Sequence, residues 1–162
     1  TYVMQEVNKL VGNDVSSKVN NSEVVQSSGT ESEAVENIED ALNIKMPQLF
    51  YIPDTLKYQS CFIDEQAQSA IMQYSYQGQI ITWMVLGNDK EASGNTLIDG
   101  AKNVEEITSE LTPNLTCELW KIEEKDENDT YVLRWQYKNI YYEFIGKIEE
   151  NEMRMIAQKI MC

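Results

Sequence analysis

Histidine is absent from this chain of 162 residues. It is the side chain that proteins use most often as a general base, and it is their usual switch near neutral pH. Without it no serine or cysteine can be paired with an imidazole base, and no Gly-x-Ser-x-Gly motif is present. A glycine-rich phosphate loop is also missing. We therefore expect a protein that is not an enzyme and that holds no cofactor and no metal ion.

Positive charge is scarce as well. The chain has 13 lysines and arginines against 27 aspartates and glutamates, which gives a formal net charge of −14. Nucleic-acid binding requires clustered basic side chains that neutralise phosphates, and docking on an anionic membrane surface has a similar requirement. We expect neither of these partners. The partner that we expect is another protein or an apolar small molecule.

Long apolar runs do not occur. No stretch of about 18 apolar residues is present, so we expect no membrane span within the chain. The sequence starts at Thr1 rather than at a methionine, which is consistent with an anchor or an export signal upstream. Any attachment to a membrane would then depend on a segment outside this chain.

The three cysteines are far apart in the sequence and form no Cys-x-x-Cys pair. They therefore predict neither a zinc site nor a redox motif. Cys61 and Cys117 lie in apolar runs typical of strands, where a buried thiol is expected. The sequence leaves open whether these two cysteines form a disulfide.

The first 30 residues differ in composition from the rest. Val3, Val7 and Leu10 follow helical spacing and predict a short helix, whereas the Asn-rich and Ser-rich stretch from Gly12 to Gly29 predicts a loop or linker. We expect residues 1–30 to be an N-terminal helix and linker, close to the membrane if an anchor precedes them. Residues 31–162 are then expected to form a single α+β domain.

A helix is predicted at the start of this domain. Thr30 and Glu33 form a capping box, and an apolar stripe that includes Ile38 follows, so the helix should run from Glu31 to Leu42. Pro47 and Pro53 then restrict the segment between them to an extended conformation.

Most of the remaining chain has the alternation of strands. Residues 80–86 are almost continuously apolar, which indicates a central strand buried on both faces. A closing hairpin with a turn at Lys138-Asn139 precedes a helix expected from Glu149 to Met161. The expected strands cover residues 56–63, 70–76, 80–86, 104–110, 115–123, 129–137 and 140–146. The predicted fold class is α+β: a curved antiparallel sheet of about six or seven strands, with a C-terminal helix on one face and one or two N-terminal helices.

Acidic residues give two weak candidates for chemistry. Asp126 and Asn128 in the loop from Glu123 to Asp129 could contribute oxygen ligands to calcium, but Tyr131 and Tyr137 stand where such a loop needs a glycine and a glutamate. A solvated loop is the better interpretation. Pairs of carboxylates could serve a hydrolase, but no spacing encloses a site for them.

Aromatic residues give the other candidate. Trp83, Trp120 and Trp135 could line a groove for an apolar or sugar ligand, although large rings on strands usually pack the core. The alternation of the last hairpin assigns most of its rings to the core. Tyr141 and Ile145 face the other way, and we predict a possible interaction surface there.

The segments described above resemble a bacterial family of domains of unknown function, number 4367, over residues 46–161. The resemblance rests on Pro47-Gln-Leu-Phe-Tyr-Ile-Pro53 with Tyr58, on the hairpin from Met72 to Leu86, and on the C-terminal segment. That last segment reads Trp135-x-x-Lys-Asn-x-Tyr-Tyr-x-Phe-x-Gly146, followed by Glu152 and an apolar helix.

The resemblance implies an extracytoplasmic domain that follows a single membrane helix, sometimes in proteins similar to anti-sigma factors. It also implies a curved sheet like those of lipoprotein carriers and sigma-regulator sensor domains. We therefore expect a non-enzymatic sensing or protein-interaction domain at the cell surface of a bacterium, tethered by a segment outside this chain. The alternative is a module that binds an apolar or lipid-like ligand between the sheet and a helix.

Overall fold

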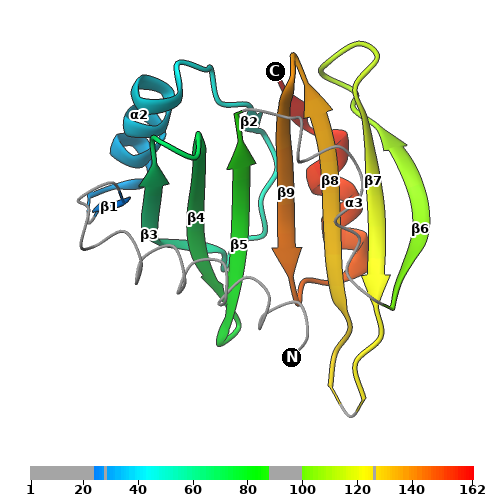
Figure 1. Ribbon diagram of the computed structural model, residues 1–162. Coiled ribbons are helices and arrows are strands. Elements are labelled where there is room, and N and C mark those ends of the chain that lie inside the picture. The colour runs from blue at the N-terminus through cyan, green and yellow to red at the C-terminus, as the bar shows by residue number, and fades with distance from the viewer. Residues whose placement is uncertain (1–23, 28, 88–99, 126) are drawn as a thin grey trace.

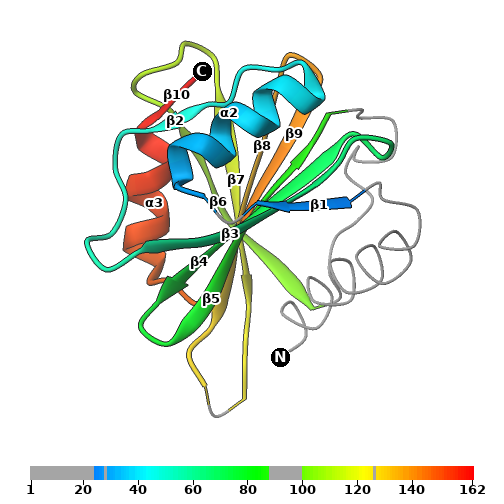
Figure 2. The same cartoon turned by 90° about the vertical axis from the view of Figure 1, so that its left-hand side faces the viewer.

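The computed structural model describes residues 24–27, 29–87, 100–125 and 127–162. The helix expected around Val3 to Leu10 lies outside these residues. Within them the chain forms an α+β fold with helices α2 (Glu31–Leu42) and α3 (Glu150–Gln158). Both helices lie on the same side of a large, twisted sheet (Figures 1 and 2). The predicted fold class is confirmed.

Eight strands in the described residues form this open antiparallel sheet in the order β1-β3-β4-β5-β9-β8-β7-β6. The strands expected from the sequence are all present and form the seven longer members, with each hairpin partner adjacent in space. Their bounds are β3 (Lys57–Asp64), β4 (Ser69–Tyr76), β5 (Gln79–Leu86), β6 (Ala101–Thr108), β7 (Thr116–Ile122), β8 (Thr130–Tyr137) and β9 (Ile140–Gly146).

The eighth strand, β1 (Val24–Ser27), corrects the sequence prediction. A loop or linker was expected for this stretch, but its backbone pairs antiparallel with β3, with Ser27 opposite Cys61. The pairing supplies hydrogen-bond partners to the outer edge of β3, which would otherwise be an open edge. Its sequence, Val-Val-Gln-Ser, lacks the alternation of apolar and polar residues that marks a strand.

The N-terminus of α2 is fixed as predicted. The side-chain oxygen of Thr30 accepts a hydrogen bond from the backbone N–H of Glu33 at 3.2 Å, which satisfies one of the free donors of the first turn. The helix ends at Asn43, which takes the left-handed conformation with φ 52°. Ala34, Ile38 and Leu42 form its buried stripe.

A continuous row of buried side chains crosses the helix-covered face of the sheet. Cross-strand register places Trp83 of β5 between Met72 and Phe144, and the row continues on both sides. Its members are Cys61, Met72, Trp83, Phe144, Leu133 and Leu119, all nearly inaccessible to solvent. The Trp83 ring lies 6.4 Å from that of Phe144 and 6.3 Å from that of Trp135. The prediction that β5 is buried on both faces is confirmed.

The two helices cover different parts of this face. Helix α2 packs on β3 and β4, and α3 packs on β6, β7 and β8. Two tyrosine hydroxyls of the sheet bind the start of α3. That of Tyr76 donates a hydrogen bond to a carboxylate oxygen of Glu149 at 2.6 Å, and that of Tyr131 donates one to Glu150 at 3.3 Å. The centre of the sheet therefore lies between the two helices.

The C-terminal helix is shorter than predicted. It was expected to reach Met161, but it ends at Gln158. The residues that follow form a short strand, β10 (Ile160–Met161), which pairs antiparallel with β2 (Gln48–Leu49). The carbonyl of Ile160 accepts hydrogen bonds from the hydroxyls of Ser109 and Thr112 at 2.6 and 2.9 Å. These long-range partners replace the hydrogen bonds that another helical turn would make.

The Lys138-Asn139 turn generates a stability prediction. Both residues have positive φ, 49° and 64°, as a two-residue hairpin turn of type I′ requires. Replacing them by Asn-Gly (K138N together with N139G) should raise the free energy of unfolding by about 1 kcal/mol, because glycine adopts this conformation without steric cost. Urea titration measures the difference.

The Gln77-Gly78 turn is the matched control. Gly78 has φ 77°, and a Cβ added there would meet no atom within 4 Å, so Gly78→Ala tests backbone conformation alone. We expect it to lower the free energy of unfolding by about 1 kcal/mol. An unchanged or lower stability of the Asn-Gly variant would contradict this account of the hairpin.

Candidate functional site

The face of the sheet opposite the helices carries a row of charged side chains. Register aligns Glu143 of β9 with Arg134 of β8, and Arg134 with Glu118 of β7. Glu106 of β6 lies opposite Glu118 and completes the row. One arginine is thus placed among three glutamates by strand pairing alone.

Tyr141 lies two residues before Glu143 on β9, and its side chain is therefore on the same face as this row. The Arg134 Nε–H donates a hydrogen bond to the Tyr141 hydroxyl, and the same nitrogen lies 3.9 Å from a carboxylate oxygen of Glu143. The guanidinium carbon is 5.2 Å from the centre of the Tyr141 ring, within the range of a cation–π contact. All three side chains are buried.

Burial also changes the acidity of the two acidic members of this cluster. It raises the pKa of Glu143 from 4.5 to about 7, because the loss of hydration outweighs the opposing effects of Arg134 and the Tyr141 hydroxyl. Burial likewise raises the pKa of Tyr141, with the Glu143 carboxylate as a second cause. Glu143 therefore changes charge close to neutral pH.

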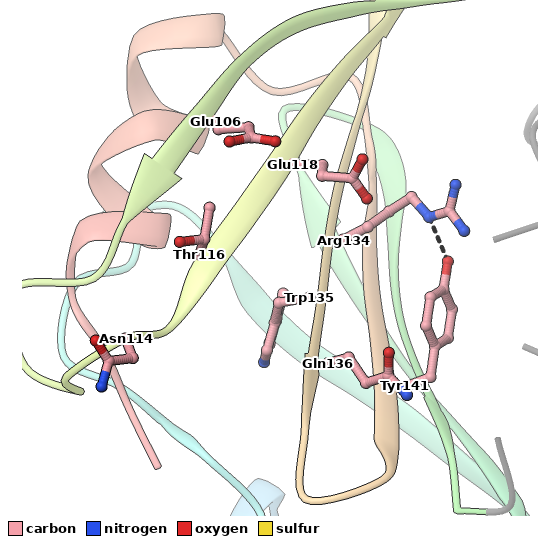
Figure 3. A pocket seen from close by; sticks show the side chains of 8 residues that line it. All are labelled: Glu106, Asn114, Thr116, Glu118, Arg134, Trp135, Gln136 and Tyr141. Carbon is pink, nitrogen blue, oxygen red and sulfur yellow. Dashed lines mark hydrogen bonds between the residues drawn. The ribbon is translucent and has the colours of Figure 1, made fainter. Parts of the chain in front are cut away.

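A cavity of about 380 Å³ adjoins the cluster (Figure 3). Figure 3 shows Arg134 and Tyr141 joined on one side of it, with Glu118 and Glu106 on the adjacent strands. Its walls offer carboxylates, amides and a guanidinium for polar contacts. The lining residues are Glu106, Asn114, Thr116, Glu118, Arg134, Trp135, Gln136 and Tyr141.

The two residues that the sequence predicted as an interaction surface are now placed. Tyr141 lines this polar cavity and is 6% exposed. Ile145 lies on the same face, but it is 1% exposed and packs with Ile122 and Val132. The structure thus brings Tyr141 to a cavity and Ile145 to a small apolar cluster. The interaction surface stays a prediction.

The acidic loop considered for calcium is held by a lysine. Lys147 Nζ lies 2.7 Å from a carboxylate oxygen of Glu127 and 3.9 Å from one of Glu124, and Asp126 lies outside the described residues. Across the described ranges, no three acidic or cysteine side chains gather in a way that would hold a metal ion.

A second and larger cavity, of about 560 Å³, lies on the helix-covered face. We call it the groove, and we call residues 44–56, which connect α2 to β3, the strap. Tyr74, Trp83 and Phe144 line the groove from the centre of the sheet, and α2 and the strap form its walls. Figure 2 shows the strap passing along the helix side of the sheet. The lining residues are Glu31, Ser32, Val35, Glu36, Glu39, Lys45, Met46, Pro47, Gln48, Leu49, Ile52, Leu56, Tyr74, Trp83 and Phe144.

The strap is attached at both ends of the groove. The backbone N–H of Met46 donates to a carboxylate oxygen of Glu39 at 2.8 Å, and that of Phe50 donates to the carbonyl of Lys159 at 2.9 Å. The Tyr51 hydroxyl donates to Glu152 of α3, a contact that raises the pKa of Tyr51 to about 12. These bonds hold the strap across the space between the helices.

Apolar side chains are exposed where the strap meets solvent. Phe50 is 60% exposed and Ile52, which lines the groove, is 43% exposed. The sequence analysis did not predict that residues of the strap line a groove. The available signal was the pair of prolines around an apolar segment, because such a segment is extended and cannot join a helix.

The family model for the domain of unknown function DUF4367 matches residues 46–160. The chain belongs to the DUF4367 family. No curated protein and no solved structure matches it significantly. The match contains residues 46–56 of the strap, the seven longer strands and α3, whereas α2 precedes it. The DUF4367 domain therefore provides the floor and one wall of the groove, and α2 provides the other wall. Neither helix of the described ranges has the length and apolar character of a membrane span.

Glu143 generates a prediction about pH and stability. Its pKa in the folded protein, about 7, is above the ordinary value of 4.5 that it regains on unfolding. Its contribution to stability is therefore fully present below pH 4.5 and is lost as the pH rises to about 7, by roughly 3 kcal/mol. Glutamine does not titrate, so the free energy of unfolding of Glu143→Gln should rise by roughly 3 kcal/mol relative to that of the natural protein as the pH increases from 4.5 to about 7.

Denaturant titrations of both proteins at several pH values measure this difference, and other titrating groups cancel in the comparison. The carbon chemical shift of the Glu143 carboxyl, followed by NMR, reports its pKa directly. A stability difference that does not vary between pH 4 and 8 would show that burial does not control this carboxyl.

Proposed function

We propose that this DUF4367 domain is a non-enzymatic sensing domain whose groove binds an apolar ligand between α2, the strap and the sheet. The observation that carries the proposal is the groove itself, a cavity of about 560 Å³ lined by aromatic rings at the sheet. Cavities of several hundred Å³ with mostly apolar walls are typical of small-molecule sites.

The position of the groove supports ligand binding rather than simple core packing. Helix α3 packs on β6, β7 and β8, so the rings of Trp83 and Phe144 at the sheet centre are faced by the strap. The strap contributes Met46, Leu49 and Ile52 to the lining, and the unbranched side chain of Met46 can adapt to a ligand.

The strap also supports a sensing role. It is bonded to α2 through Glu39 and to the C-terminal elements through Tyr51 and Glu152. A ligand that displaces the strap would change contacts at both helices, and such a change can be read by a partner protein. The polar cavity around Tyr141, on the opposite face, is available for that partner.

We extend the proposal to location. The DUF4367 resemblance described above supports an extracytoplasmic domain tethered to the membrane of a bacterium, in some cases in a protein similar to an anti-sigma factor. An apolar ligand at the cell surface is consistent with such a place, because membranes and cell envelopes are the source of lipid-like molecules.

Ligand binding can be tested with N-phenyl-1-naphthylamine, an uncharged apolar dye whose fluorescence increases in apolar surroundings. We expect the chain to bind it, and we expect Val35→Phe to weaken binding at least about tenfold, because a larger ring on α2 fills the groove. Fluorescence titration gives both dissociation constants.

The matched control is Ile80→Phe. Ile80 is 45% exposed and does not line the groove, so the same enlargement there should leave dye binding unchanged. Circular dichroism verifies that both variants fold. Equal dye binding by the natural protein and Val35→Phe, or no binding by either, would overturn the proposed ligand site.

The proposed location has its own test. A protease added to intact cells that produce the full-length natural protein should remove this domain while a cytoplasmic marker protein survives. Cleavage only after the cells are lysed would contradict an extracytoplasmic location. This outcome would not bear on ligand binding, which the dye titration tests.

A further inference from the structure

Among the described residues, the short strand of the strap is paired along one edge only. In the ladder between β2 and β10, Leu49 stands opposite Ile160. At the next step the N–H of Phe50 donates to the carbonyl of Lys159 at 2.9 Å. In an antiparallel ladder, pairs that exchange hydrogen bonds alternate with pairs that do not. The pair of Leu49 and Ile160 is therefore of the second kind, and each residue directs its N–H and carbonyl away from the other.

The two carbonyls of that pair have different surroundings. The carbonyl of Ile160 accepts hydrogen bonds from the hydroxyls of Ser109 and Thr112, in agreement with its pointing away from β2. The N–H and carbonyl of Leu49, a half-buried residue, have no hydrogen-bond partner among the described residues. The outer edge of β2 therefore carries one free donor and one free acceptor.

This free edge borders the groove. The lining of the groove includes Pro47, Gln48 and Leu49 of the strap, but among the described residues it includes none of β10 or α3. The edge of β2 that faces away from β10 is therefore the one on the groove side. An unpaired strand edge can bind an extended chain through main-chain hydrogen bonds, and pockets beside it receive alternate side chains of that chain.

The strap holds this edge in place before any ligand arrives. Pro47 and Pro53, on either side of the segment that contains β2, are both buried. Hydrogen bonds to Glu39 of α2 and to Glu152 of α3 fix the strap between the two helices. A binding edge that is already ordered loses little conformational freedom when its ligand binds.

We propose that the groove binds an extended peptide, which pairs with the free edge of β2 as a third strand. This inference rests on the proposed binding of an apolar ligand in the groove. One residue of the peptide exchanges two hydrogen bonds with Leu49. Side chains alternate between the two faces of a strand, so one set lies on the rings of Trp83 and Phe144 and is apolar. The other set points outward to the rim of the groove.

Charge complementarity specifies the outward set. Glu36 of α2 lines the groove and is exposed, and Lys45 is the one basic residue of the described lining. The chain as a whole has a formal net charge of −14. Lysine or arginine at the outward positions is attracted to this rim, and added salt weakens the attraction. The occupant is thus a peptide in which apolar and basic residues alternate.

The peptide acetyl-Lys-Val-Lys-Val-Lys-amide is the probe, and calorimetric titration measures its affinity. Two derivatives test strand pairing, one methylated on the backbone nitrogens of the valines and the other on those of the lysines. Only one of these alternating sets of N–H groups can face β2. We therefore expect one derivative to bind at least about tenfold more weakly than the parent peptide and the other to bind like it. Replacing the lysines of the probe by glutamates should weaken binding at least about tenfold at low salt.

A pair of variants assigns the pairing to Leu49. Leu49→Pro removes the N–H from the free edge, where proline is tolerated because β10 does not use that donor. Leu49→Ala is the matched control, since it also shortens the side chain but keeps the N–H. We expect Leu49→Pro to bind the peptide at least about tenfold more weakly than Leu49→Ala, while both variants still bind the apolar dye. Circular dichroism verifies that both fold.

Hydrogen exchange gives a measurement that needs no variant. In the natural protein, followed by NMR, the peptide should slow the exchange of the Leu49 amide hydrogen at least about tenfold. The Phe50 amide is already bonded to Lys159 and serves as the internal reference, because its exchange should change less.

The outcomes distinguish this inference from the proposed function. If the dye binds but the peptide neither binds nor displaces it, the groove is a ligand site and the peptide inference is wrong. Equal effects of the two methylation patterns, or unchanged exchange of the Leu49 amide, overturn strand pairing in the same way. Equal affinity for the lysine and glutamate peptides overturns the assignment of basic residues. If neither dye nor peptide binds, the proposed function fails and the inference fails with it.

Discussion

The burial of one row of large side chains across the middle of the sheet is the constraint on which the rest of this structure depends. Trp83 and Phe144 occupy adjacent central strands, and both are nearly inaccessible to solvent. Burying rings of this size provides a large share of the hydrophobic stabilisation of a small domain. It also fixes the register, because a slip by one residue would move every ring to the opposite face.

Once the register is fixed, both faces of the sheet are determined. The residues that alternate with the buried row must point the other way, which places Arg134 between Glu143 and Glu118 on neighbouring strands. The same register leaves Trp83 and Phe144 facing the space between the helices, where the strap crosses. The polar cavity and the groove are therefore two consequences of one pairing pattern.

Features that depend on neighbouring residues could be predicted from the sequence, and features that depend on distant pairing could not. The capping of α2 by Thr30 and the turn at Lys138-Asn139 are local, and the structure confirms both. Strand β1 and the pairing of β2 with β10 join segments far apart in the chain, for which no local signal exists. The candidate sites follow the same division: alternation placed Tyr141 on the outer face, but the groove needs α2, the strap and three strands at once.

The attachment of the strap relates the groove to the C-terminal end of the fold. The hydroxyl of Tyr51 and the backbone of Phe50 are bonded to α3 and to the residue that follows it, and Ile160 pairs with Leu49 beside them. Each bond is a modest contribution on its own, on the order of 1 kcal/mol. A ligand that lifts the strap must break them together, so its binding free energy would be divided between filling the groove and releasing the C-terminal segment. Under the proposed function, that shared cost would be the physical route by which a ligand in the groove changes contacts elsewhere on the domain.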